Sequence, residues 1–113
     1  MLPEDDRVRI RHMLEAAEEV LEFAEGRSRG DLDTDRMLSR AMVRDIEIIG
    51  EAASRVTSAT RQICPELPWS SIIAMRNKLI HAYFDVDNDR LWDTIVVDIP
   101  MLLPALRNIL ESG

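Results

Sequence analysis

The sequence predicts an all-helical protein, an antiparallel up-and-down four-helix bundle, and three observations support this class. Apolar residues recur at intervals of three and four along most of the chain, and no strand-like alternation of comparable length competes with them. The breaks between the periodic segments are short and contain Gly, Pro or clustered Asp. The length of 113 residues suits one domain, so we expect residues 1–113 to form a single helical unit.

The first two helices are predicted over Pro3–Glu25 and Thr34–Thr57. Asp33 or Thr34 is expected to cap the second one. Gly50 lies beside the apolar stripe of that helix and costs about 1 kcal/mol relative to alanine. A close approach of another helix would offset this cost. The opposite face carries charges at the spacing of a solvated helix: Arg40, Arg44, Glu47, Glu51 and Arg55.

The third helix is predicted from Trp69 to Phe84, after a loop closed by prolines. The acidic run at 85–89 reads as a turn that also caps the fourth helix. Pro100 and Pro104 lie inside this last helix, so we expect it to be kinked there, or to restart near residue 99.

Bulk properties exclude several classes of protein. Hydrophobic residues make up 46% of the chain, which is too many for a disordered acidic tail despite a net charge of -7. The acidic balance argues against a general nucleic-acid coat but leaves room for a local basic pocket. Cys64 is the one cysteine, so no disulfide can form within the chain. With no signal peptide and no apolar run long enough for a bilayer, we expect a cytoplasmic protein without membrane contact.

The third predicted helix holds an unusual polar cluster. On a helical wheel Arg76 falls in the middle of the apolar arc that runs from Trp69 to Ile80. Tyr83 falls on the same stripe two turns later, Asn77 and His81 share the adjacent stripe, and three residues face away: Met75, Lys78 and Ala82.

An arginine in that position needs a counter-charge, because it cannot lose its proton. One interpretation is a structural arginine bonded to a bundle carboxylate or to helix-end carbonyls. The other is an arginine in a cleft that binds a phosphate. His12 is expected to be exposed, and two histidines without a carboxylate at ligand spacing do not predict a metal site. No cofactor is predicted either.

The cluster also resembles a known family. The run Arg76-Asn77-Lys78-Leu79-Ile80-His81-Ala82-Tyr83 matches the Arg-x4-His pattern of HEPN domains, in the form extended by x-Tyr. Further pieces resemble the HepT-like ribonuclease toxins of that superfamily: Ile48-Ile49-Gly50-Glu51-Ala52, Pro68-Trp69, Trp92 and Asp98-Ile99-Pro100. The resemblance extends over nearly the whole chain.

The resemblance implies a homodimeric helical bundle that acts as a metal-independent endoribonuclease, the toxin of a type VII toxin–antitoxin system. It also implies a partner, an MntA-type nucleotidyltransferase antitoxin that silences the toxin by attaching AMP to a tyrosine. Carried onto this chain, the catalytic pair would be Arg76 and His81, with Asn77 in support. The modified residue would be Tyr83.

These residues suit the implied chemistry. An imidazole with an unperturbed pKa near 6.5 can act as acid or base on the ribose 2′-hydroxyl, and a guanidinium can hold the developing negative charge. The motif region has one histidine, so a second imidazole would have to come from a symmetry mate. On a continuous helix Tyr83 would lie about 10 Å along the axis from Arg76, within reach for an attached AMP phosphate.

Two other functions stay open at this point. The chain could be a non-catalytic HEPN-like helical partner that binds a nucleotidyltransferase, which the acidic net charge favours. It could also be a structural bundle in which Arg76 belongs to a buried ion pair.

Overall fold

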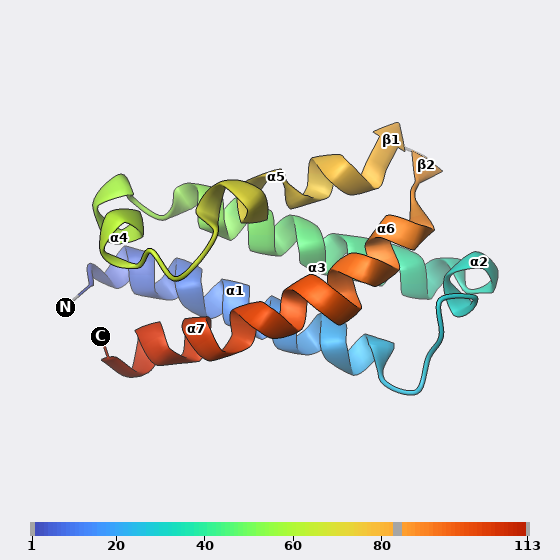
Figure 1. Cartoon of the computed structure of the whole chain (residues 1–113), viewed down its shortest axis with the longest axis horizontal. Coiled ribbons are helices and arrows are strands. Elements are labelled where there is room, and N and C mark those ends of the chain that lie inside the picture. Colours follow the sequence, from blue (N-terminus) through green and yellow to red (C-terminus); the bar gives the residue numbers. More distant parts are fainter. Residues whose placement is uncertain (1, 83–84, 113) are drawn as a thin grey trace.

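The computed structural model describes residues 2–82 and 85–112, with the backbone alone for His81 and Ala82, and most of these residues are helical (Figure 1). The long helices are α1 (Glu4–Ala24), α3 (Arg36–Arg55), α5 (Trp69–Leu79) and α7 (Ile99–Ser112). The elements between them are α2 (Asp31–Thr34), α4 (Ser58–Ile63), β1 (Ile80–Ala82), β2 (Asp85–Val86), α6 (Asn88–Asp93) and the π-helical turn η1 (Thr94–Asp98).

The long helices lie side by side and alternate in direction. In Figure 1, α1 and α5 run one way while α3 and the α6–α7 segment run the other. Helix α1 packs against both α3 and α7, and α3 also packs against α5. The residues with no exposed surface come from all of these helices, among them Ile10, Met13, Met42, Ile46, Ile49, Ile72, Leu79, Ile99 and Leu106. Over the described residues, no helix is both long enough and apolar enough to cross a bilayer.

The start of α3 differs from the prediction. The predicted caps, Asp33 and Thr34, belong to the separate turn α2. The cap of α3 is Asp35, whose Oδ1 atom accepts a hydrogen bond from the Leu38 amide at 3.0 Å. Asp35 has an extended backbone, which separates the two helices. The predicted loop after α3 also holds a short helix, α4.

Gly50 confirms the close helix approach that the sequence predicted. A Cβ atom built at Gly50 would lie 3.4 Å from the carbonyl oxygen of Ile72 and 3.5 Å from that of Ile73. The backbones of α3 and α5 therefore meet here without a side chain between them. This contact fixes where α5 lies along α3.

The last helical segment begins where expected. The Oδ1 atom of Asp87 accepts a hydrogen bond from the Arg90 amide at 3.1 Å and caps α6. Hydrogen bonding then widens to the π-helical pattern over Thr94–Asp98, and α7 begins at Ile99. Pro100 has no amide hydrogen to bond the carbonyl four residues before it, which is a local reason for the irregular turn. Pro104 is accommodated inside α7.

Two buried carboxyl groups hold elements together in opposite ways. Asp6 accepts hydrogen bonds from the amide and hydroxyl of Thr57 and from the hydroxyl of Thr60, which ties the start of α1 to the start of α4. Burial alone would raise the pKa of Asp6, but these hydrogen bonds outweigh it and lower the pKa. Asp45 on α3 is 2% exposed, and burial together with the neighbouring Glu19 carboxyl raises its pKa to about 7.

The Oδ2 atom of Asp45 has no hydrogen-bond partner among the described residues. A buried carboxylate without a donor is costly, so the protonated form of Asp45 is favoured, which fits its raised pKa.

A pair of substitutions at Gly50 tests the backbone contact. In Gly50→Ala the new Cβ atom meets the Ile72 carbonyl at ordinary contact distance and gains helix propensity, so we expect stability unchanged or raised by up to about 1 kcal/mol. Gly50→Leu must push α5 away, which we expect to cost about 1–3 kcal/mol. Urea unfolding measures both. Equal tolerance of alanine and leucine would contradict a backbone-to-backbone approach.

A pH series tests Asp45. Its pKa is raised from 3.8 to about 7, so the folded chain holds a proton that the unfolded chain releases between these values. The free energy of unfolding should therefore fall as pH rises from about 4 to about 7. Asp45→Asn should remove this fall and be more stable than wild type at pH 8, by on the order of 1 kcal/mol. Urea unfolding at pH 5, 6, 7 and 8 gives both curves.

His12, Glu15 and Glu19 line a surface hollow together with Asp45. The effect of Asp45 itself is therefore the difference between the free energies of unfolding of wild type and Asp45→Asn at each pH. Parallel curves for the two proteins would show that Asp45 carries no proton at neutral pH.

Candidate functional site

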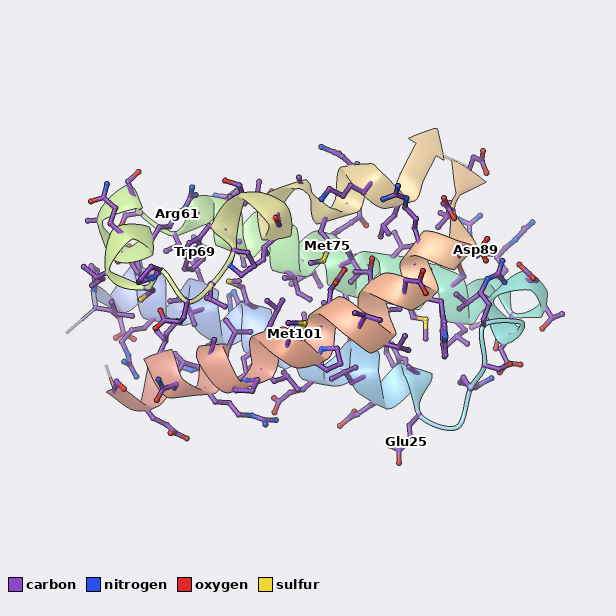
Figure 2. All side chains as sticks on the ribbon, viewed as in Figure 1. Glu25, Arg61, Trp69, Met75, Asp89 and Met101 are labelled. Carbon is purple, nitrogen blue, oxygen red and sulfur yellow. The ribbon has the colours of Figure 1, made fainter. Side chains whose placement is uncertain are left out.

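Helix α5 positions the first half of the polar cluster. It begins at Trp69, whose buried indole Nε1 donates a hydrogen bond to the Cys64 carbonyl at 3.0 Å (Figure 2). Its inner face is formed by Trp69, Ile72, Met75 and Leu79, all buried. Met75 therefore faces the core, and the prediction that it faces away is wrong. Arg76, Asn77 and Lys78 are all exposed.

Arg76 lies at the edge of the apolar face of α5, and the prediction that it lies in mid-core is wrong. Its side chain is 44% exposed. The Nε atom donates a hydrogen bond to Oε2 of Glu47 on α3 at 2.7 Å, and the Glu47 side chain is 31% exposed. The arginine thus has the bundle carboxylate that one of the two interpretations required.

The pairing leaves part of the guanidinium free. Glu47 engages the Nε side, and among the described residues the two terminal nitrogens have no partner. Those nitrogens form a planar fork of donors that suits a phosphate or carboxylate. Glu47 can therefore orient the arginine while the outer edge of its guanidinium stays open to an anion.

The prediction that Glu47 lies on a solvated helix face is wrong. Glu51 and Arg55 on that face do form an exposed pair along α3, with a separation of 2.9 Å. Glu47 instead reaches across to α5. No pattern within α3 distinguishes the two glutamates, because the difference comes from which neighbouring helix covers each turn.

The second half of the cluster is not helical. Helix α5 ends at Leu79, and β1 follows, so the prediction of a helix through Phe84 is wrong. β1 pairs antiparallel with β2, with Ile80 opposite Val86 and Ala82 opposite Asp85. The Leu79 carbonyl accepts a hydrogen bond from the Asp87 amide at 2.7 Å, which closes the base of the hairpin. In Figure 1 the hairpin extends from the end of α5 above α6.

This change of structure alters the predicted geometry. His81 lies in β1 and cannot share a helical stripe with Asn77, and its side chain lies outside the described residues. Tyr83 also lies outside them, and the helix on which its distance from Arg76 was based ends at Leu79. Ile80 and His81 are weaker helix formers than most residues, whereas Ala82 is a strong one, so propensity accounts for only the first part of the strand.

A groove of about 770 Å³ opens beside Arg76. Residues of α2, α3, the end of α5, the hairpin and the start of α6 line it. The lining includes four basic side chains, Arg36, Arg40, Arg44 and Arg76, as well as Glu47, Ile80, Asp85, Val86 and Asn88. Sequence reasoning missed the arginines of α3 as site residues, although their spacing of four along one helix was a usable signal.

A second groove, about 890 Å³, lies on the other side of α5. Met75 on α5 and Met101 on α7 both line it, and Figure 2 labels both. Lys78 lines it as well, but Arg76 does not. Since the polar cluster that suits phosphate chemistry starts at Arg76, the smaller groove is the candidate site. Among the described side chains, no group of three or more His, Cys, Asp or Glu residues is placed to hold a metal ion.

Comparison with known proteins places the chain in a family. The family described as Ribonuclease HepT-like matches residues 13–109. A "Putative RNase" of Caldanaerobacter subterraneus subsp. tengcongensis is 39% identical over 103 residues, which cover 91% of this chain and 92% of that protein. A "Probable ribonuclease HepT" of Thermococcus cleftensis is 40% identical over 93 residues, covering 82% of this chain and 84% of that protein.

A "Putative RNase" of Methanocaldococcus jannaschii is 32% identical over 102 residues, covering 90% of this chain and 94% of that protein. No solved structure matches the chain. The family match and these relatives span most of the chain, and the chain therefore belongs to the HepT-like ribonuclease family.

Proposed function

We propose that this chain is an endoribonuclease that cuts RNA without a metal ion, with Arg76 and His81 as its catalytic pair. One observation carries the proposal: Glu47 holds the Arg76 guanidinium by one edge and leaves its outer edge open at an arginine-lined groove. Relatives named as ribonucleases support nuclease chemistry. Asn77, exposed beside Arg76, would support the pair through its amide.

The reaction would be an internal transfer at phosphorus. The ribose 2′-oxygen forms a bond to the adjacent phosphorus, the bond from phosphorus to the 5′-oxygen breaks, and a 2′,3′-cyclic phosphate remains. A base takes the proton from the 2′-hydroxyl, and an acid gives a proton to the leaving 5′-oxygen. His81 would serve as one of these groups, and Arg76 would stabilise the charge that builds on the phosphate oxygens.

The need for both an acid and a base favours a homodimer. The chain has two histidines, and the other one, His12, is exposed on α1 and does not line the groove beside Arg76. A second copy related by two-fold symmetry would bring the second His81. We therefore propose that the active form is a dimer, and that a cognate nucleotidyltransferase assembles with it.

The proposal extends to regulation in a type VII toxin–antitoxin system. The nucleotidyltransferase would attach AMP to Tyr83 and silence the toxin. Tyr83 lies in the sequence between β1 and β2, and Ile80, Asp85 and Val86 of these strands line the groove beside Arg76. A nucleotide attached there would bring its phosphate close to the arginines and occupy space that RNA needs.

A second function has a specific observation in its favour. The Arg76–Glu47 ion pair already meets the arginine's need for a counter-charge. This would suit a non-catalytic helical subunit that binds a nucleotidyltransferase, or a purely structural arginine. Both alternatives predict that Arg76 affects stability or partner binding rather than RNA cleavage.

Cleavage of RNA in the presence of a chelator tests the catalytic pair. Unmodified chain, made without the nucleotidyltransferase, should cut single-stranded RNA and leave 2′,3′-cyclic phosphate ends. Arg76→Ala and His81→Ala should each lower kcat by about 100-fold or more, because each removes a group that acts in the transition state. Product ends are identified by mass spectrometry, and rates by gel analysis under single-turnover conditions.

Lys78→Ala is the matched control, since Lys78 is exposed on α5 but lines the other groove. Arg76→Lys keeps the charge but loses the planar fork, and we expect it to lose at least about tenfold in rate. Full activity in Arg76→Lys and Arg76→Ala, together with a lower unfolding temperature in the alanine variant, would identify a structural arginine instead.

Co-expression with the nucleotidyltransferase tests Tyr83. Wild-type chain should carry one AMP group by intact-mass analysis and lose cleavage activity. Tyr83→Phe lacks the hydroxyl that accepts AMP, so it should stay unmodified and active, and growth of the host should arrest. A Tyr83→Phe chain that stays silenced while unmodified would exclude AMP transfer to Tyr83 as the control.

A further inference from the structure

Three arginines form a row along α3. Arg36, Arg40 and Arg44 are exposed, lie one turn apart, and line the same groove as Arg76. Each step is about 6 Å along the helix axis, from four residues at about 1.5 Å each. We call these three residues the arginine ridge. Glu47, the partner of Arg76, lies one turn beyond Arg44, so the ridge leads toward the catalytic arginine.

The arginine ridge lacks the ion pairs that other arginines near it make. Arg29 pairs with both Asp33 and Asp89, and Arg76 with Glu47. Figure 2 labels Asp89 at the end of the molecule near α2. Among the side chains that the structure describes, which leave out residues 81–84, none forms an ion pair or hydrogen bond with a ridge arginine. The charge of Arg44 opposes the rise that burial and Glu19 cause in the pKa of the neighbouring Asp45.

The chain has 21 acidic and 14 basic residues, and the ridge places three of the basic ones along one groove. Three acidic residues line the groove, and two of them are already engaged: Arg29 and Asn88 hold Asp33, and Arg76 holds Glu47. Asp85 is the third, so one unengaged carboxylate stands against three ridge arginines, and the groove keeps an excess of positive charge. An anion from outside the chain is the natural counter-charge.

The spacing of the ridge indicates an anionic polymer. One phosphate is contacted by one or two arginines, whereas three charges in equal steps over about 12 Å suit several phosphates in succession. We propose that the arginine ridge binds the phosphodiester backbone of single-stranded RNA and guides it to Arg76. This inference rests on the proposed ribonuclease function and adds the path of the substrate to it.

An acidic surface of a protein partner is the competing occupant. RNA fits better because the ridge ends at Arg76, whose free guanidinium edge is proposed to hold the phosphate that is cut. A strand bound along the ridge would therefore reach the turn of α3 at which Glu47 holds Arg76. Contacts to successive phosphates would also be independent of base sequence.

Binding of labelled RNA tests the arginine ridge. The probe is a fluorescent single-stranded RNA oligonucleotide, and the protein is the His81→Ala chain, which binds without cutting. Arg36, Arg40 and Arg44 are changed together to Gln, a good helix former, so α3 should persist. Fluorescence anisotropy at several salt concentrations should show Kd raised at least about tenfold. The slope of log K against log salt should become shallower by about 2, from three lost phosphate contacts.

Two controls separate charge from fold. Changing the same three residues to Lys should keep most of the affinity, since phosphates are held mainly by charge. Arg11→Gln removes an exposed arginine of α1 that does not line the groove, and it should leave Kd and the salt slope unchanged.

The outcomes distinguish this inference from the function on which it rests. If the wild-type chain cuts RNA, a triple Gln variant that binds equally well in the His81→Ala chain and cuts equally well with His81 present would overturn the ridge alone. A triple Gln variant that keeps RNA affinity but no longer binds the nucleotidyltransferase would assign the ridge to a protein partner. Wild-type chain that neither binds nor cuts RNA would overturn the proposed function and the ridge together.

Discussion

The contact between the backbones of α3 and α5 at Gly50 fixes the candidate site. At that point the carbonyls of Ile72 and Ile73 approach α3 as closely as a side-chain carbon would allow. The two helices run in opposite directions. Residues one turn before Gly50 on α3 therefore lie beside residues one turn after Ile72 on α5. Glu47 and Arg76 lie at those positions and pair at 2.7 Å. The ion pair is therefore a consequence of the packing, and not its cause.

An ion pair this exposed contributes little to stability, typically about 0–1 kcal/mol. Its effect is instead on orientation, because Glu47 fixes the Nε side of Arg76 and points the rest of the guanidinium outward. The arginine ridge then adds positive charge along α3 in a chain whose net charge is -7. The net charge of the chain therefore does not indicate the electrostatic potential at the groove. The proposed binding of an RNA strand would depend on that local potential.

Patterns within single helices predicted the fold well and the site less well. Apolar spacing located α1 and α3, the acidic run supplied the Asp87 cap, and the cost of Gly50 pointed to a close approach. Two of the errors at the site come from contacts between elements, which the pattern of a single helix does not contain. The hairpin closes through Leu79 and Asp87, and Arg76 finds its partner on another helix. Neither contact produces a periodic pattern of residues in the sequence.

The early end of α5 changes how an Arg-x4-His motif can work. On a continuous helix, five residues turn through about 500°, so Arg76 and His81 would point about 140° apart. One phosphate could not easily meet both side chains. Because the helix ends at Leu79, between the two residues, this constraint does not apply to His81 in β1. The same break removes the shared helical stripe of Arg76 and Tyr83. The proposed regulation through Tyr83 would therefore depend on the hairpin, whose strands on both sides of that residue line the groove.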